Sequence, residues 1–154
     1  MTKSTETGAR VRLPPPLVLL AAIAGGWLLP GLRVHQHHFA RIALGALLLA
    51  GGCALGFGAL RLFRKTGQSP QPWKPTPEMI FSGPYRYTRN PMYVGMVLLT
   101  LGVAALAGHA WIALLSPVEL AIVHFTSVLP EEEYLAQKFG PPYLAYQAKV
   151  RRYL

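Results

Sequence analysis

"IALGALLLAGGCALGFGAL", residues 42–60, decides the fold class of this chain. The stretch has no charged residue and no proline, and it is about as long as a helix must be to cross the ~30 Å hydrocarbon core of a bilayer. Within it, Gly52 and Gly56 form a pair of small residues four apart, which lets a neighbouring helix approach closely. The stretch therefore predicts a transmembrane helix that packs against another helix.

Three further apolar blocks surround this stretch, at residues 16–31, 91–108 and 110–129. A composition of 52% hydrophobic and 14% charged residues is too apolar for an ordinary soluble domain of 154 residues. Blocks one and three are short enough to resemble buried core helices. We expect one all-α domain over residues 1–154, an integral membrane helical bundle of about four transmembrane helices, with a loop at 61–90 and a C-terminal segment at 130–154.

The first apolar block has a second interpretation, because the basic residues Lys3, Arg10 and Arg12 precede it as they would a signal peptide. No clean cleavage site of small residues follows the block. We therefore interpret it as an anchor helix.

The formal net charge of +9 follows the expected topology. With four spans, the basic residues of the N-terminus, of loop 61–90 and of the tail fall on one side of the membrane, and only Arg33 and Arg41 fall on the other. The positive-inside rule then places both termini and the loop in the cytoplasm, at the cytoplasmic membrane. Because the charges do not form one surface stripe, we expect affinity for anionic membrane lipids and no nucleic acid partner.

The first connection contains three histidines, His35, His37 and His38, which raise the possibility of a metal site. No carboxylate or thiolate lies beside them in sequence. A polar turn at the membrane interface is the commoner explanation, so no metal site is expected.

Loop 61–90 is the longest segment outside the spans, and prolines at 70, 72, 75 and 77 exclude regular helix from its first half. Long structured loops in small proteins are often functional, for example as lids over a site.

A helical hairpin is expected to bring polar residues together at the end of this loop. Asn90 followed by Pro91 is typical of a helix start, and the next helix returns to "LPEEEYL", residues 129–135. Two antiparallel spans of similar length would place "RYTRN" near the glutamates. Alternatively, the glutamates form the first turn of a new helix, where the helix dipole favours acidic residues. Since half of the chain's six acidic residues lie here, we favour a polar pocket at the membrane surface.

The residues after the glutamates predict an amphipathic helix in the membrane interface, buried on its aromatic side, because apolar and aromatic side chains recur every three or four positions across a break at "GPP". These are Leu135, Phe139, Tyr143, Tyr146, Val150 and Tyr153. Inside the fourth span, Glu119 and His124 are costly in hydrocarbon. They either line a ligand cavity or satisfy a contact between helices.

Two linked motifs carry a family resemblance. "GPYRYTRNPMYVG" and, after a short hairpin, "EEEYLAQKFGPPYLAYQAKVRR" resemble the integral membrane methyltransferases that include isoprenylcysteine carboxyl methyltransferase and the phospholipid N-methyltransferases. The resemblance extends from Ser82 to the C-terminus. The matching positions are Arg89, Asn90, Pro91, Tyr93, Gly95, Glu131, Glu132, Leu135, Phe139, Gly140, Tyr143 and Tyr146.

The resemblance implies a pocket for S-adenosylmethionine made by the two motifs and reached from the cytoplasm, with a lipophilic substrate entering from the bilayer. The implied cofactor-binding residues are Tyr85, Arg89, Asn90, Pro91, Tyr93, Gly95, Glu131, Glu132 and Leu135. The expected catalytic residues are Arg89, Glu132 and Arg151, and a carboxylate or thiolate acceptor would need a nearby cation, for which Arg86, Arg89 or Arg151 could serve. Asn90 stands where eukaryotic carboxyl methyltransferases have histidine, which argues against prenylcysteine as the substrate.

The residue types suit this cofactor, because carboxylates and aromatic faces stabilise a sulfonium cation and arginine binds a carboxylate. Two other functions remain open. Related membrane folds include reductases that use a nicotinamide cofactor. A noncatalytic lipid-binding scaffold would instead use the same charged residues as a structural ion cluster.

Overall fold

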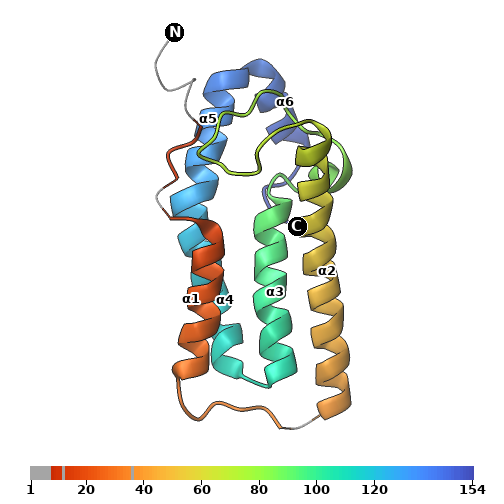
Figure 1. The fold of residues 1–154 in the computed structure, drawn as a ribbon, viewed down its shortest axis with the longest axis vertical. Helices are drawn as coiled ribbons and strands as arrows, with labels where there is room; N and C mark the ends of the chain where they lie inside the picture. The colour runs from red at the N-terminus through yellow and green to blue at the C-terminus, as the bar shows by residue number, and fades with distance from the viewer. Residues whose placement is uncertain (1–7, 12, 36) are drawn as a thin grey trace.

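The computed structural model describes residues 8–11, 13–35 and 37–154. It is an upright helical bundle without any strand in these ranges, which confirms the all-α prediction (Figure 1). The helices are α1 (Pro15–Leu28), α2 (His38–Lys65), α3 (Pro91–Ala107), α4 (Ala110–Val123), α5 (Leu129–Phe139) and α6 (Pro141–Lys149), with a 3-10 turn η2 (Gly83–Arg86) and a π-helical turn η3 (His124–Val128).

Two helices are long and apolar enough to cross a membrane, namely α2 and the continuous helix Ala110–Phe139. Only 17% and 33% of their most apolar windows are buried, whereas the core helix of a soluble protein would be mostly buried. Large apolar side chains such as Leu47 and Phe57 of α2 instead face outward, as they do where a helix meets lipid. Helices α1 and α3 are apolar but shorter.

The bounds of α1 and α2 differ from the expected spans. Helix α1 ends at Leu28 rather than at residue 31, because the residue before Pro30 is disfavoured in helical conformation. Helix α2 extends beyond residues 42–60 in both directions. Loop 61–90, α5 and α6 lie at the same end of the bundle as the described part of the N-terminal segment (Figure 1). Lys3 and Arg12 lie outside the described residues.

Helices α2 and α3 approach closely at a pair of glycines. A Cβ atom added to Gly52 would lie 2.7 Å from the carbonyl oxygen of Gly95, and one added to Gly95 would lie 2.9 Å from the carbonyl oxygen of Gly52. At Gly56 a Cβ atom would meet nothing within 4 Å. The predicted close approach is therefore confirmed at Gly52, and its partner Gly95 holds α3 against α2.

The glutamates of "LPEEEYL" do not open a separate helix, because Ala110–Phe139 is continuous. Pro130 lacks the N–H that an α-helix interior requires, and η3 precedes it with the wider π-helical hydrogen-bond spacing that often accommodates such an irregularity. Helices α4 and α5 thus form one rod, which carries Glu131 and Glu132 from the span to the end of the bundle.

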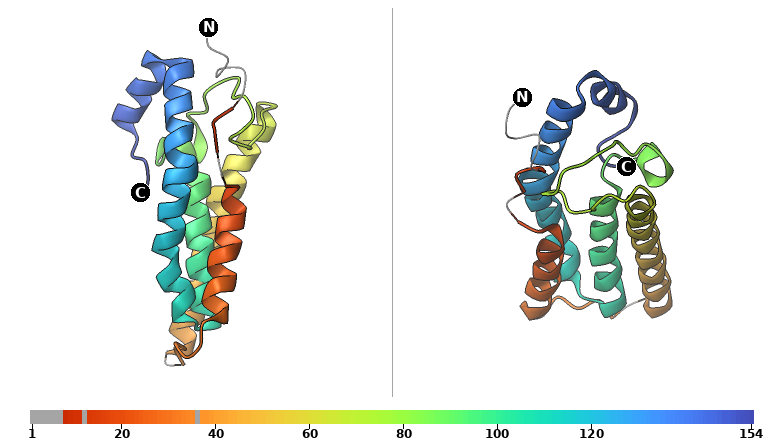
Figure 2. Two further views of the ribbon diagram at one scale, coloured as in Figure 1. Left: turned by 90° about the vertical axis from the view of Figure 1, so that its left-hand side faces the viewer. Right: turned by 45° about the horizontal axis from the view of Figure 1, so that its top comes forward.

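The segment predicted as an interfacial amphipathic helix is divided at the expected "GPP" break, and its aromatic side faces the protein. The chain breaks at Gly140, whose φ of 60° is unfavourable for other residues, and α6 then turns back beside the end of the bundle (Figure 2). Tyr143 is 3% exposed, and Tyr146 lines a cavity within the protein. The tyrosines of α6 therefore contact the protein rather than only the membrane interface.

Candidate active site

The site is organised around the carboxylate of Glu132 on α5, whose side chain is 9% exposed. Nε and Nη2 of Arg89 donate to Oε1 at 3.1 and 2.9 Å. On the other side, Nη2 of Arg152 donates to Oε2 at 2.7 Å, and its Nε lies 3.1 Å from both oxygens. One buried carboxylate thus joins two guanidinium groups, one from the start of α3 and one from the C-terminal tail.

The C-terminal tail, residues 150–154, is held against the start of α3 by backbone and side-chain hydrogen bonds. Nη1 of Arg89 donates to the carbonyl oxygens of Gln147 and Val150. The Arg89 backbone N–H donates to the carbonyl of Arg151 at 2.9 Å, and Thr88 Oγ1 donates to the carbonyl of Arg152 at 3.0 Å. This pairing carries the Arg152 side chain to Glu132.

Asn90 occupies the expected position before α3, but its side chain makes no capping hydrogen bond. Its Nδ2 instead donates to the carbonyl oxygen of Arg152 at 3.1 Å. Pro91 stands at the first turn of the helix, as predicted. The amide of Asn90 therefore joins α3 to the tail, and the helix start relies on proline.

Glu131 makes a separate contact. The hydroxyl of Tyr93 on α3 donates to Oε2 of Glu131 at 2.8 Å. Glu131 has no arginine partner among the described residues, in contrast to Glu132. The two adjacent glutamates therefore differ in charge environment: Glu132 lies between two cations, and Glu131 lies beside a phenol.

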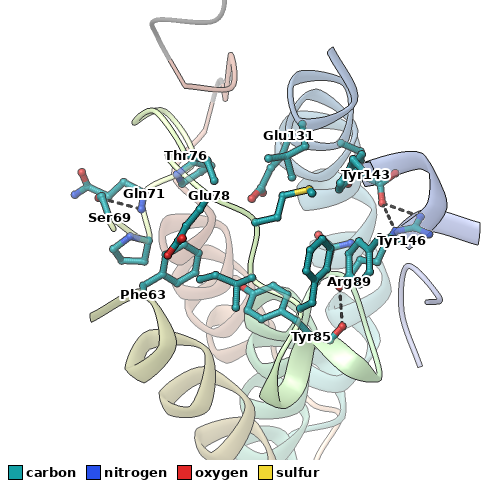
Figure 3. A pocket seen from close by; sticks show the side chains of 18 residues that line it. Phe63, Ser69, Gln71, Thr76, Glu78, Tyr85, Arg89, Glu131, Tyr143 and Tyr146 are labelled. Carbon is teal, nitrogen blue, oxygen red and sulfur yellow. Dashed lines mark hydrogen bonds and ion pairs between the residues drawn. The ribbon is translucent and has the colours of Figure 1, made fainter. Parts of the chain in front are cut away.

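A first cavity, of about 70 Å³, opens between loop 66–82, η2, α5 and α6. Figure 3 shows Glu131, Arg89 and three tyrosines around it, with Phe63, Ser69, Gln71, Thr76 and Glu78 opposite. Its predicted lining residues are Tyr85, Arg89, Asn90, Glu131, Glu132 and Leu135. The cavity combines carboxylates with aromatic faces, a donor set that suits an organic cation.

A second cavity, of about 240 Å³, lies beside the first one, between the start of α1, the start of α3 and loop 66–82. Its lining is mainly apolar and includes Pro15, Trp73, Met92 and Met96, together with Pro91 and Tyr93. The two cavities share eight lining residues, and the polar ones among them include Tyr85, Arg89, Asn90 and Glu131. The other four are Phe63, Pro70, Gln71 and Pro72. The two cavities are therefore neighbouring compartments with a shared polar wall.

Burial and charge change the acid–base behaviour of the wall. Burial, and to a lesser extent the charge of Glu131, raises the pKa of Tyr85 well above its usual range. Burial raises the pKa of Tyr146 to about 12, although Arg89 acts in the opposite direction. Hydrogen bonds to Glu132 raise the pKa of Arg152. At neutral pH these tyrosines are therefore uncharged phenols, and Arg152 is a permanent cation.

Two of the expected site residues lie elsewhere. Gly95 packs against α2, and among the described residues it lines neither cavity. The Arg151 side chain is exposed, and Arg152 instead occupies the position beside Glu132. Sequence analysis missed Arg152 and Thr88, because no residue pattern shows which of two adjacent arginines turns inward.

Glu119 and His124 are not among the described residues that line either cavity. Glu119 is 1% exposed inside the bundle. His124 in η3 makes a helix-to-tail contact, because its Nδ1 lies 2.8 Å from the hydroxyl oxygen of Tyr153. Of the two alternatives for His124, the contact is the one observed.

Comparisons of the sequence with known proteins identify similar proteins. The curated protein-S-isoprenylcysteine O-methyltransferase of Schizosaccharomyces pombe is 35% identical over 72 residues, which cover 47% of this chain and 30% of that protein. The chain thus matches less than a third of that relative's length. No solved structure matches the chain. The sequence profile of the phospholipid methyltransferase family matches residues 40–142, more than half of the 154 residues. This chain, with its paired cavities at the end of an apolar bundle, therefore belongs to the phospholipid methyltransferase family.

Proposed function

We propose that this protein transfers a methyl group from S-adenosylmethionine to a lipid or another hydrophobic small molecule, at the cytoplasmic face of the cytoplasmic membrane. The observation that carries the proposal is the polar wall shared by two cavities, one lined by carboxylates and tyrosines and one mainly apolar. Such a pair can hold a charged donor and an apolar acceptor side by side, and alignment of two reactants lowers the barrier of their reaction.

The residues of the first cavity fit the cofactor chemically. S-adenosylmethionine, when bound, supplies an activated methyl group on a sulfonium cation. The faces of Tyr85, Tyr143 and Tyr146 and the carboxylate of Glu131 lie around the first cavity, and both kinds of group stabilise a cation. Glu131 also faces the second cavity. There its carboxylate is placed to take up the proton that the methylated substrate releases.

Admission of the cofactor requires loop 66–82 to move, because about 70 Å³ is below the ~300–1,000 Å³ of usual ligand pockets. The loop has few long-range tethers. The backbone N–H of Thr76 donates to the Tyr134 hydroxyl at 3.2 Å, and the Ala9 N–H donates to the Pro72 carbonyl at 2.7 Å. Closure of this loop would exclude water from the transfer.

The test is to incubate purified protein with methyl-labelled S-adenosylmethionine and a lipid extract, and to measure label in the lipid fraction. Glu131→Gln removes the carboxylate from the shared wall. If Glu131 accepts the proton, this substitution is expected to lower the rate of methyl transfer at least ~100-fold. Glu133→Gln is the matched control, because Glu133 is exposed and its observed contact is with Gln137 on its own helix.

Two results would contradict the proposal. In one, the parent protein gives no labelled lipid, and NADPH rather than S-adenosylmethionine raises its unfolding temperature, as expected of a reductase. In the other, neither cofactor stabilises the protein, as expected of a scaffold.

A further inference from the structure

An open groove of about 390 Å³ lies outside the candidate active site, between η2 and α6. Arg86 of η2 and Lys149 at the end of α6 contribute its two cations, and Phe81, Pro142 and Val150 contribute apolar surface. Within the part of the chain that the structure describes, no carboxylate lines the groove. Among the described residues, neither cation forms an ion pair. The groove thus combines unpaired positive charge with apolar walls.

The position of the groove along the bundle axis follows from its contacts with the candidate active site. Val150, which follows Lys149, accepts a hydrogen bond through its carbonyl oxygen from Nη1 of Arg89 at 2.8 Å. Arg89 lies two residues before the apolar helix α3, and Arg86, the last residue of η2, precedes Arg89 by three positions. Both cations are therefore at the height where α3 leaves the apolar layer, which is where the phosphates of one leaflet would lie.

One wall of the groove is also a wall of the first cavity, because Phe81 and Tyr146 line both. Their rings meet edge to face with centroids 4.9 Å apart, and the Tyr146 hydroxyl donates to the carbonyl of Tyr85 at 2.7 Å. Tyr146 is seen beside Arg89 on the cavity side in Figure 3. A ligand in the groove would therefore contact the outer side of this aromatic pair.

We propose that the groove binds the phosphate headgroup of an anionic phospholipid between Arg86 and Lys149, and that the bound lipid stabilises the Phe81–Tyr146 wall. The two cations supply charge complementarity for the phosphate. The apolar walls face the same layer as the glycerol and upper acyl chains, which a soluble anion lacks. The site is separate from the methyl acceptor compartment, which lies beside α1 and α3.

The test measures binding of phosphatidylglycerol to the full-length protein in phosphatidylcholine nanodiscs or in detergent, by native mass spectrometry. The double variant Arg86→Gln/Lys149→Gln is expected to weaken lipid binding about tenfold or more, because each lysine or arginine near an anionic headgroup strengthens the binding. Arg64→Gln with Lys74→Gln is the control, because it removes the same charge from exposed residues at the same end of the bundle. That control is expected to change binding less than about twofold.

Hydrogen exchange provides the second measurement. Phosphatidylglycerol is expected to slow amide exchange in residues 79–87 and in α6 of the parent protein, and not in the Arg86/Lys149 double variant. Equal loss of binding in both double variants would show diffuse attraction and would overturn the proposal. Displacement of the lipid by inorganic phosphate at matched ionic strength would also overturn it, because the groove would then recognise the anion alone.

Discussion

The guanidinium of Arg89 lies 2.9 Å from the carboxylate of Glu132, although 43 residues separate the two in sequence. The pair joins Arg89, two residues before α3, to α5 in the second part of the rod formed by α4 and α5. Arg152 then approaches the same carboxylate from the tail at 2.7 Å. The site is therefore closed only when the hairpin, α6 and the tail have all taken their places.

Arg152→Gln is expected to weaken S-adenosylmethionine binding, because Glu132 loses one of its two cation partners. The matched control is Arg151→Gln, which removes the same charge from the adjacent exposed residue and leaves its backbone carbonyl to accept from Arg89. Isothermal titration in detergent should show a several-fold or larger loss for Arg152→Gln and a near-parental value for Arg151→Gln. The reverse order would favour Arg151 as the functional residue.

Glu132→Ala is expected to lower the free energy of unfolding by about 3–5 kcal/mol, because it leaves Arg89 without its carboxylate in a poorly solvated place. Glu133→Ala, one residue along on the exposed side of α5, is expected to change it by no more than ~0.5 kcal/mol. Denaturant unfolding in mixed micelles measures both. Equal effects of the two substitutions would show that the buried pair does not stabilise the fold.

Gly95→Ala is expected to lower the free energy of unfolding by about 1–3 kcal/mol, because the added methyl group would lie 2.9 Å from the Gly52 carbonyl oxygen. Gly56→Ala on the facing helix meets open space and should be tolerated. Thermal unfolding in detergent separates the two variants. If Gly95→Ala unfolds at the same temperature as the parent protein but no longer binds the cofactor, Gly95 acts in cofactor binding, as the family resemblance implies, rather than in helix packing.

Tyr153→Phe is expected to loosen the tail, because it removes the contact of 2.8 Å with Nδ1 of His124. The loss should be about 1 kcal/mol in the local opening free energy of residues 150–154, and the KM for S-adenosylmethionine should rise while kcat changes less. Tyr87→Phe, at a tyrosine that is 74% exposed, is the control. His124→Asn can still form a hydrogen bond with Tyr153 and is expected to keep the tail as stable as in the parent protein. His124→Leu cannot, and is expected to loosen the tail as Tyr153→Phe does.

Alkaline pH is expected to destabilise the protein through its buried tyrosines. The pKa of Tyr146 is raised from 10.0 to about 12 in the folded chain, so between these values the unfolded state loses the Tyr146 proton while the folded state keeps it. The unfolded state then binds fewer protons, and stability falls as pH rises through this window. Tyrosinate absorbance should therefore titrate late in the folded protein, and Tyr146→Phe should reduce the late fraction.

Much of the architecture could be predicted from residue patterns. The uncharged run at 42–60 predicted α2, and Asn90-Pro91 predicted the start of α3 within one residue. The reason is that span length and helix starts depend on local composition and on the backbone chemistry of proline. The meeting of "RYTRN" with the glutamates followed from hairpin geometry, which needs only two antiparallel helices of similar length.

Other features depend on the angular position of a side chain around its helix and on the path of loops. Which of Arg151 and Arg152 faces Glu132 is set by the backbone pairing of the tail with Arg89. That α6 turns Tyr143 inward follows from the break at Gly140. A linear pattern of apolar residues carries neither piece of information, because the same stripe can face lipid or protein.

The sequence by itself determined that the chain forms apolar helices with basic and acidic residues at one end, since hydrophobicity and charge act on every residue regardless of its partners. Only the tertiary structure decided which partners meet: Gly95 with Gly52, Arg152 with Glu132, and Tyr153 with His124. Each of these contacts joins segments far apart in the chain or on different elements, and its existence depends on the relative rotation and depth of packed helices.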